Sequence, residues 1–210
     1  LAVIFIFKQL FKASRPRHWT KNLLVFAAPL FSFQTDNLIW VKIFQALVCF
    51  CLLSSSVYIL NDVIDAQSDR LHPIKRFRPI AAKLLSKQAA CIASLTLIII
   101  SLYLGFLVSN SLLLILAIYL IIQIMYCLKL KEEPLLDLMC ISSGFLLRAI
   151  SGGISSNLSI SPWFLLSIGL LALFLALEKR KAEIRNININ KITTRKVLKR
   201  YSLPLLLRIE

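Results

Sequence analysis

Two long segments without a charged residue constrain the fold of this chain most strongly. Residues 89–108 read AACIASLTLIIISLYLGFLV, and residues 111–128 read SLLLILAIYLIIQIMYCL. Each segment is close to the ~20 residues that an α-helix needs to cross a bilayer. Neither shows the alternating polarity of a strand in a membrane β-barrel. The sequence therefore predicts an all-α integral membrane protein.

The composition of the whole chain agrees with this interpretation. Of its 210 residues 58% are hydrophobic and only 17% are charged, whereas about a quarter of the residues in a soluble domain are charged. We expect one transmembrane domain over residues 1–210, with helices at 22–34, 38–61, 88–108, 111–128, 134–153 and 162–178 and a seventh beginning near residue 201. Pro29 predicts a kink in the first helix. Residues 1–21 mix basic and apolar side chains, which is typical of an amphipathic segment on the membrane surface.

Lys and Arg gather in the connections on one side of the predicted bundle. Only Lys42, Arg148 and Arg208 lie outside residues 8–21, 70–87, 129–134 and 179–200. Basic connections of membrane proteins face the cytoplasm. This asymmetry accounts for the net charge of +15 without a nucleic-acid partner, and stacking aromatics are not interleaved with these charges. We therefore predict cytoplasmic catalytic loops at residues 61–87 and 179–200.

An acidic motif, NDVIDAQSDR at residues 61–70, follows the second predicted helix directly. Asp62, Asp65 and Asp69 are three and four residues apart, which places them on one helical face. Three carboxylates on one face repel each other unless a cation holds them. Mg²⁺ prefers oxygen ligands and is often shared between one or two carboxylates and a substrate phosphate. The motif thus indicates a magnesium–phosphate site.

A helix end held by ordinary salt bridges is the alternative interpretation of this motif. Its carboxylates and the basic residues that follow could neutralise each other in water. Ionisable groups at the mouth of a membrane bundle are costly, however, and usually functional. We therefore favour the metal–phosphate interpretation.

The acidic motif resembles the first aspartate-rich motif, NDxxDxxxD, of the UbiA superfamily of intramembrane prenyltransferases. Three longer segments are similar to its decaprenyl-phosphate phosphoribosyltransferase branch: RPRHWTKNLLVFAAPLF (15–31), DRLHPIKRFRPIAA (69–82) and LKLKEEPLLDLMCISSGFLLRAISGG (128–153). The resemblance implies nine transmembrane helices around a central cavity. About six of them and the start of a seventh fit into 210 residues, so we expect a fragment.

The resemblance also implies a reaction. The donor would be 5-phosphoribosyl diphosphate, the acceptor a polyprenyl phosphate and the cofactor Mg²⁺. The product would be a lipid-linked phosphoribose for cell-envelope synthesis, made at a bacterial inner membrane with the active site facing the cytoplasm. A phosphate acceptor is already ionised at neutral pH, so no strong general base is required.

A second acidic motif separates the branches of this superfamily. Aromatic prenyltransferases have DxxxD at the end of the sixth helix, where this chain has LALEKRKAEI (175–184). Its two acids, Glu178 and Glu183, are separated by three cations, and the branch has Gly where Glu178 stands. The extra cations fit substrates that carry more phosphate.

We predict Asp62, Asp65 and Asp69 as catalytic metal ligands, with Asn61 as a supporting group. The predicted substrate-binding residues are Arg17, Lys21, Lys75, Arg76, Arg78, Tyr126, Lys129, Asp137, Arg148, Lys179, Arg180 and Glu183. Some have a simpler interpretation: Tyr126 and Lys129 could anchor a helix at the interface, and Arg148 could pair with another helix. His18 and His72 lack a second histidine at ligand spacing, so we do not expect them to bind metal.

Two further functions stay open at this point. A UbiA-type prenyltransferase would transfer a prenyl group from a prenyl diphosphate to an aromatic or other small acceptor. A non-catalytic transporter would give flux across the membrane and no covalent product. The choice of donor separates the two enzymes.

Overall fold

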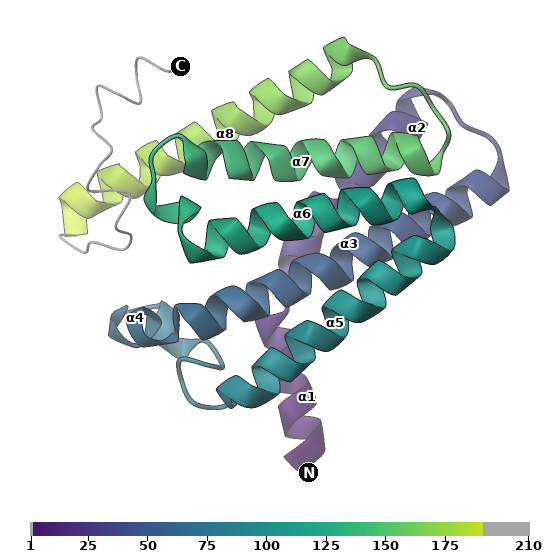
Figure 1. Cartoon of the computed structure of the whole chain (residues 1–210). Helices are drawn as coiled ribbons and strands as arrows, with labels where there is room; N and C mark the ends of the chain where they lie inside the picture. Colours follow the sequence, from purple (N-terminus) through teal and green to yellow (C-terminus); the bar gives the residue numbers. More distant parts are fainter. Residues whose placement is uncertain (1, 191–210) are drawn as a thin grey trace.

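The computed structural model describes residues 2–190, and this range contains helices and no strands. Five α-helices within this range are long and apolar enough to cross a membrane. They confirm the predicted all-α membrane fold and lie side by side in Figure 1. The spanning helices are α3 (Asn37–Ile64), α5 (Lys87–Val108), α6 (Asn110–Leu128), α7 (Leu136–Ser155) and α8 (Pro162–Asn190). Shorter elements are α1 (Ala2–Ala13), η1 (Pro16–Phe26), α2 (Ala27–Phe31), α4 (Ala66–Leu71), η2 (Lys75–Phe77) and η3 (Leu130–Glu132).

Helix α3 lies at the centre of the bundle and packs against η1, α5, α6 and α7. Its buried Phe50 and Leu53 belong to the main core together with Leu116 of α6. Hydroxyl groups join α3 to α5: Ser94 donates to the Ser56 carbonyl oxygen at 2.9 Å, and Ser101 donates to the Cys49 carbonyl oxygen at 2.8 Å. Such bonds satisfy polar side chains inside an apolar bundle.

The predicted first helix, 22–34, is helical only as far as Phe31 and is not one regular α-helix. The segment is instead the 3₁₀ helix η1 followed by the single α-turn α2. Pro29 lacks an N–H group and cannot donate to the Val25 carbonyl, so a regular α-helix cannot run through this segment. The Val25 carbonyl packs against Gly152 of α7 instead.

Helix α8 continues beyond the predicted end at residue 178. Two pairs on its own surface extend it: Arg180 donates to Glu183 at 2.6 Å and Lys181 donates to Glu178 at 2.9 Å. Pairs three residues apart stabilise a helix, so the charged stretch lengthens α8 rather than ending it. The predicted loop 179–200 is therefore helical as far as Asn190, while residues 191–200 and the helix expected near 201 lie outside the described residues.

The connections that carry the predicted chemistry meet at one end of the bundle. Helix α4, the α6–α7 connection and the last turns of α8 all lie at the left of Figure 1. Helices α3 and α6 end there, and α5 and α7 begin there. Side chains 60 to 70 residues apart in sequence can therefore form one site.

Gly152 allows the closest approach between η1 and α7, which suggests a test of this packing. A Cβ atom at this position would overlap the Val25 carbonyl. We expect Gly152→Ala to destabilise the protein by about 1–3 kcal/mol, because backbone cannot yield as a side chain can. The midpoint of thermal unfolding in detergent measures the effect.

Gly169 of α8 provides the matched control. A Cβ there would meet only the Leu146 side chain, at ordinary contact distances of 3.5 to 3.8 Å. Gly169→Ala should leave the midpoint unchanged or raise it, since Ala favours helix. Equal midpoints for both variants would contradict the close packing at Gly152.

Candidate active site

A cavity of about 540 Å³ opens at the end of the bundle where these connections meet. Its wall comes from η1, α3, α4, α6, α7, α8 and the segments between them. Basic side chains outnumber acidic ones in this wall. The basic residues are Arg15, Lys21, Lys75, Arg78, Lys131, Arg148, Lys179 and Arg180, and the acidic residues are Asp65, Asp69 and Glu132.

Two buried aspartates lie on either side of one arginine at the mouth of the cavity. Asp62 and Asp69 are 2% and 3% exposed. The Arg78 Nη1 atom donates to Asp62 Oδ1 at 3.2 Å and to Asp69 Oδ2 at 2.6 Å. Arg15 donates to the same Asp62 oxygen. The two carboxylates therefore face one position, which a cation fills.

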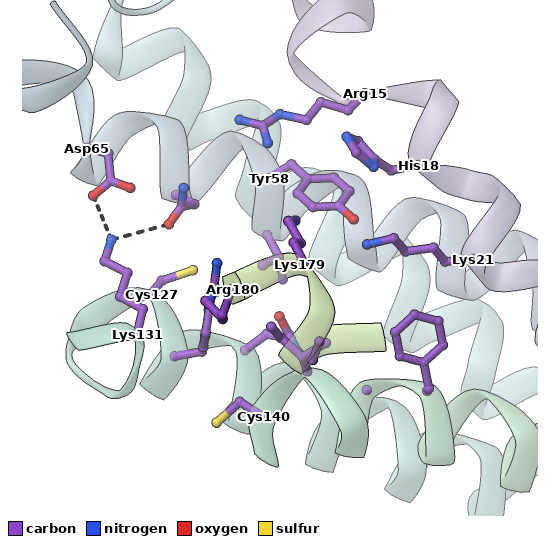
Figure 2. A pocket seen from close by; sticks show the side chains of 18 of the residues that line it. Arg15, His18, Lys21, Tyr58, Asp65, Cys127, Lys131, Cys140, Lys179 and Arg180 are labelled. Atoms are coloured by element: carbon purple, nitrogen blue, oxygen red, sulfur yellow. Dashed lines mark hydrogen bonds and ion pairs between the residues drawn. The ribbon is translucent and has the colours of Figure 1, made fainter. Parts of the chain in front are cut away.

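Asp65 faces a different cation. Helix α3 ends at Ile64, and Asp65 is its C-terminal cap residue. The Lys131 Nζ atom donates to Asp65 Oδ1 at 2.6 Å and to Asn61 Oδ1 at 3.4 Å (Figure 2). Lys131 belongs to η3, so these bonds join the end of α3 to the α6–α7 connection at the mouth of the cavity.

The oxygen donors at the mouth fit a hard divalent cation, in a smaller set than the sequence predicts. Within residues 2–190 no three Asp, Glu, His or Cys side chains gather as a ready-made metal site. Asp62 and Asp69 do face one cation position. Mg²⁺ commonly uses one or two carboxylates and completes its octahedron with water and substrate oxygens. A cation carried by a phosphate substrate suits this pair.

Arg148 lies at the inner end of the cavity and is 5% exposed. Each of its nitrogens donates to a neutral oxygen: Nε to Asn22 Oδ1 at 2.7 Å, Nη1 to the Gly144 carbonyl at 2.5 Å and Nη2 to the Tyr119 hydroxyl at 2.9 Å. Its guanidinium also lies 4.9 Å from the centre of the Tyr119 ring. These contacts hold the side chain in place without neutralising its charge.

Arg180 is also buried, but its charge is neutralised. Asp137, fully buried on α7, accepts from Arg180 Nε at 2.5 Å and from Nη2 at 2.8 Å. Asp137 accepts a third bond from the Tyr126 hydroxyl at 3.0 Å, and Glu183 takes the remaining Arg180 nitrogen at 2.6 Å. This network ties α6, α7 and α8 together.

The 3₁₀ helix η1 contributes one wall of the cavity. Arg15 directly precedes η1, and His18 and Lys21 lie on it; all three point toward the cavity beside Tyr58 (Figure 2). Arg15 has a left-handed backbone with φ of 53°, a conformation that costs a non-glycine residue of order 1–3 kcal/mol. That turn between α1 and η1 brings its guanidinium to Asp62. Desolvation first, then the charges of Lys21, Arg15 and Lys179, hold the pKa of His18 below its ordinary value.

Comparison with known proteins identifies the family. Residues 23–207 match the model of the UbiA prenyltransferase family. The chain belongs to this family. It is 41% identical over 198 residues to a decaprenyl-phosphate phosphoribosyltransferase of Mycolicibacterium smegmatis, covering 92% of this chain and 62% of that protein. It is 42% identical over 180 residues to a protein of the same name from Corynebacterium glutamicum, covering 82% of this chain and 54% of that one.

The fold matches solved UbiA structures as well. A UbiA homologue from Archaeoglobus fulgidus, bound to DMAPP and Mg²⁺, aligns with a TM-score of 0.75 at 18% identity. The alignment covers 96% of this chain and 74% of that one. At this identity the likeness establishes the UbiA fold alone. The chain spans 62% and 54% of the length of the two curated relatives described above, less than two thirds of each.

The structure of this UbiA-family chain sorts the predicted residues into three groups. The cavity wall includes Asn61, Asp65, Asp69, Lys21, Lys75, Arg78, Tyr126, Arg148, Lys179 and Arg180. Bonded to wall residues but set behind them are Asp62, Asp137 and Glu183. Outside the wall lie Arg17, Arg76 and Lys129. The predicted common face of three aspartates is interrupted, because α3 ends before Asp65.

Sequence reasoning missed several residues of the wall. Arg15, which binds Asp62, and Lys131, which binds Asp65, are the most important. Tyr119, which holds Arg148, and Tyr58 were also missed. Only Arg15 left a signal in the sequence, because it precedes His18 and Lys21 at a regular spacing of three.

Proposed function

We propose that this chain forms the membrane-embedded core of a Mg²⁺-dependent transferase. It would move a phosphoribosyl group from 5-phosphoribosyl diphosphate to a polyprenyl phosphate. The observation that carries the proposal is the cavity mouth, where Asp62 and Asp69 share one cation position and basic side chains surround them. The divalent cation of a diphosphate substrate would bind the two aspartates, and the diphosphate oxygens would bind the basic side chains. The names of the curated relatives support a polyprenyl phosphate acceptor and a transferred phosphoribosyl group.

The residues of the mouth would bind the leaving group. Mg²⁺ held by Asp62 and Asp69 would offset the negative charge that develops on the departing diphosphate. Arg78 and Lys131 now donate to the carboxylates. On substrate binding they would donate to diphosphate oxygens, which accept charge-assisted bonds equally well.

The reaction itself exchanges one C–O bond for another. An oxygen of the acceptor phosphate forms a bond to C1 of the ribose, and the bond from C1 to the diphosphate oxygen breaks with its electron pair. The acceptor oxygen is already ionised at neutral pH, so the cavity need supply only position and charge. The site would open to the cytoplasm of a bacterial cell, since the basic connections lie at this end.

Transfer of label from donor to lipid tests the proposal. Full-length protein in detergent, given labelled 5-phosphoribosyl diphosphate, a polyprenyl phosphate and Mg²⁺, should produce label in the lipid phase. EDTA should abolish the transfer and added Mg²⁺ should restore it. The measurement is the labelled fraction extracted into organic solvent over time.

The matched control supplies a labelled prenyl diphosphate and an aromatic acceptor to the same protein. We expect no product from this pair. Product from it, with none from the phosphoribosyl donor, would replace the proposal with prenyl transfer. Tracer flux in vesicles without any covalent product would indicate a transporter.

A further inference from the structure

The winding of η1 decides which of its side chains reach the cavity. A 3₁₀ helix has three residues per turn, so side chains three apart are eclipsed. His18 and Lys21 follow this spacing and both line the cavity, as does Arg15, the residue that precedes η1 directly. In an α-helix each step of three residues would rotate the side chain by about 60°. We call these three residues the η1 column. It rises about 6 Å per turn from the aspartates toward Arg148.

The inner end of the column meets an uncompensated positive charge. Arg148 makes no ion pair within the described residues, in contrast to Arg180 with its two carboxylates. A guanidinium has five N–H donors. The bonds described above use one hydrogen on each Nη atom, which leaves one on each for a ligand. A buried charge without a counter-charge is costly, so an anion in the cavity would stabilise this arrangement.

Lys21 shares this electrostatic environment. Desolvation and then the charges of Lys179 and Arg148 hold the pKa of Lys21 below its ordinary value. Its ammonium group lies over the Phe145 ring, 5.8 Å from the ring centre, and among the described residues it makes no ion pair. Asn22, the next residue of η1, accepts the bond from Arg148. Lys21 and Arg148 are thereby held in neighbouring positions at the same end of the cavity.

We propose that Lys21 and Arg148 form a second anion subsite, which binds a phosphate monoester, apart from the diphosphate position at Asp62 and Asp69. This inference rests on the proposed function and deepens it. A phosphate monoester dianion matches a lysine beside a guanidinium that has two free hydrogens, since arginine binds phosphate with two parallel bonds. Two groups of the proposed reaction have this chemistry: the 5-phosphate of the donor and the phosphate of the lipid acceptor.

Removal of the Lys21 charge tests the subsite. We expect Lys21→Gln in the full-length protein to raise the KM of one substrate by about 10- to 100-fold, the range for loss of one charge-assisted bond, with a smaller change in kcat. A higher KM for 5-phosphoribosyl diphosphate assigns the subsite to the donor. A higher KM for the polyprenyl phosphate assigns it to the acceptor. Arg148→Lys is a less direct variant, because Arg148 also joins η1 to α6 and α7.

Lys42→Gln is the control, because it also removes one lysine charge but lies on the exposed surface of α3, outside the cavity wall. It should leave both KM values unchanged. Unchanged KM values in Lys21→Gln, or equal effects of the two variants, would overturn the subsite.

A binding assay separates this inference from the proposed reaction. Ribose 5-phosphate and geranyl phosphate serve as probes, and protection from thermal unfolding is the readout. One probe should protect the unaltered protein and not Lys21→Gln. Such a difference without any phosphoribosyl transfer would support the subsite and refute 5-phosphoribosyl diphosphate as the donor. Transfer with equal protection of both proteins would support the reaction and refute the subsite.

Discussion

Asp62→Asn should lower the rate of phosphoribosyl transfer by at least about 100-fold. Asp62 is buried and shares the cation position with Asp69, so its charge acts where little water screens it. Loss of one preorganised electrostatic group commonly costs a factor of 10²–10³ in rate. The amide has nearly the same shape as the carboxylate, which keeps the effect electrostatic. The measurement is kcat/KM for the donor at saturating Mg²⁺.

The control for this variant is Asp36→Asn, at the opposite end of the same helix. Asp36 accepts a bond from the Leu38 amide and caps α3. Asn caps helices as well as Asp does, so this variant should keep full activity. Transfer by Asp62→Asn within twofold of the unaltered protein, with the same unfolding midpoint, would refute the proposed role of Asp62.

Asp137→Asn should give the largest loss of stability. The variant leaves Arg180, which is 1% exposed, without its buried bidentate partner. Breaking one partner of a buried ion pair costs about 3–5 kcal/mol. The free energy of unfolding in mixed detergent micelles measures this loss. Glu183→Gln is the matched control, and it should cost less than about 1 kcal/mol because Glu183 is partly exposed.

A double variant tests whether the unpaired charge of Arg180 causes the instability of Asp137→Asn. Asp137→Leu combined with Arg180→Met removes both charges, and replacing a buried pair by apolar side chains is often neutral. We expect the double variant to recover most of the stability that Asp137→Asn loses. Equal instability of the two proteins would show that the network does not act through charge.

The membrane helices could be predicted closely because lipid requires about 20 consecutive apolar residues in each spanning helix. Uncharged runs placed the beginnings and ends of α5 and α6 within one residue of the observed bounds. The prediction was wrong at η1 and at the end of α8, where local hydrogen bonds and ion pairs decide the backbone. The apolar content of a segment predicts neither its local hydrogen bonds nor its ion pairs.

The site could be predicted only in part, because its residues acquire their roles through partners far along the chain. The acidic motif was visible in the sequence, and the structure brings Asp65 and Asp69 to the cavity. The partner of Asp65, Lys131, is 66 residues away. Asp137 was predicted to bind substrate because it is a charged residue in an apolar segment. In the structure it is fully buried and bonded to Arg180. No local pattern distinguishes a charge that meets substrate from one that holds a neighbour.

The three-residue turn of η1 limits insertions and deletions in this segment more than substitutions. Inserting or deleting one residue between His18 and Lys21 would rotate one of them by about a third of a turn. It would then leave the cavity while its sequence neighbour entered. A substitution at Thr20, which is exposed and outside the cavity wall, carries no such penalty. The length of this stretch is therefore fixed more tightly than its composition, so insertions and deletions should be rarer here than replacements.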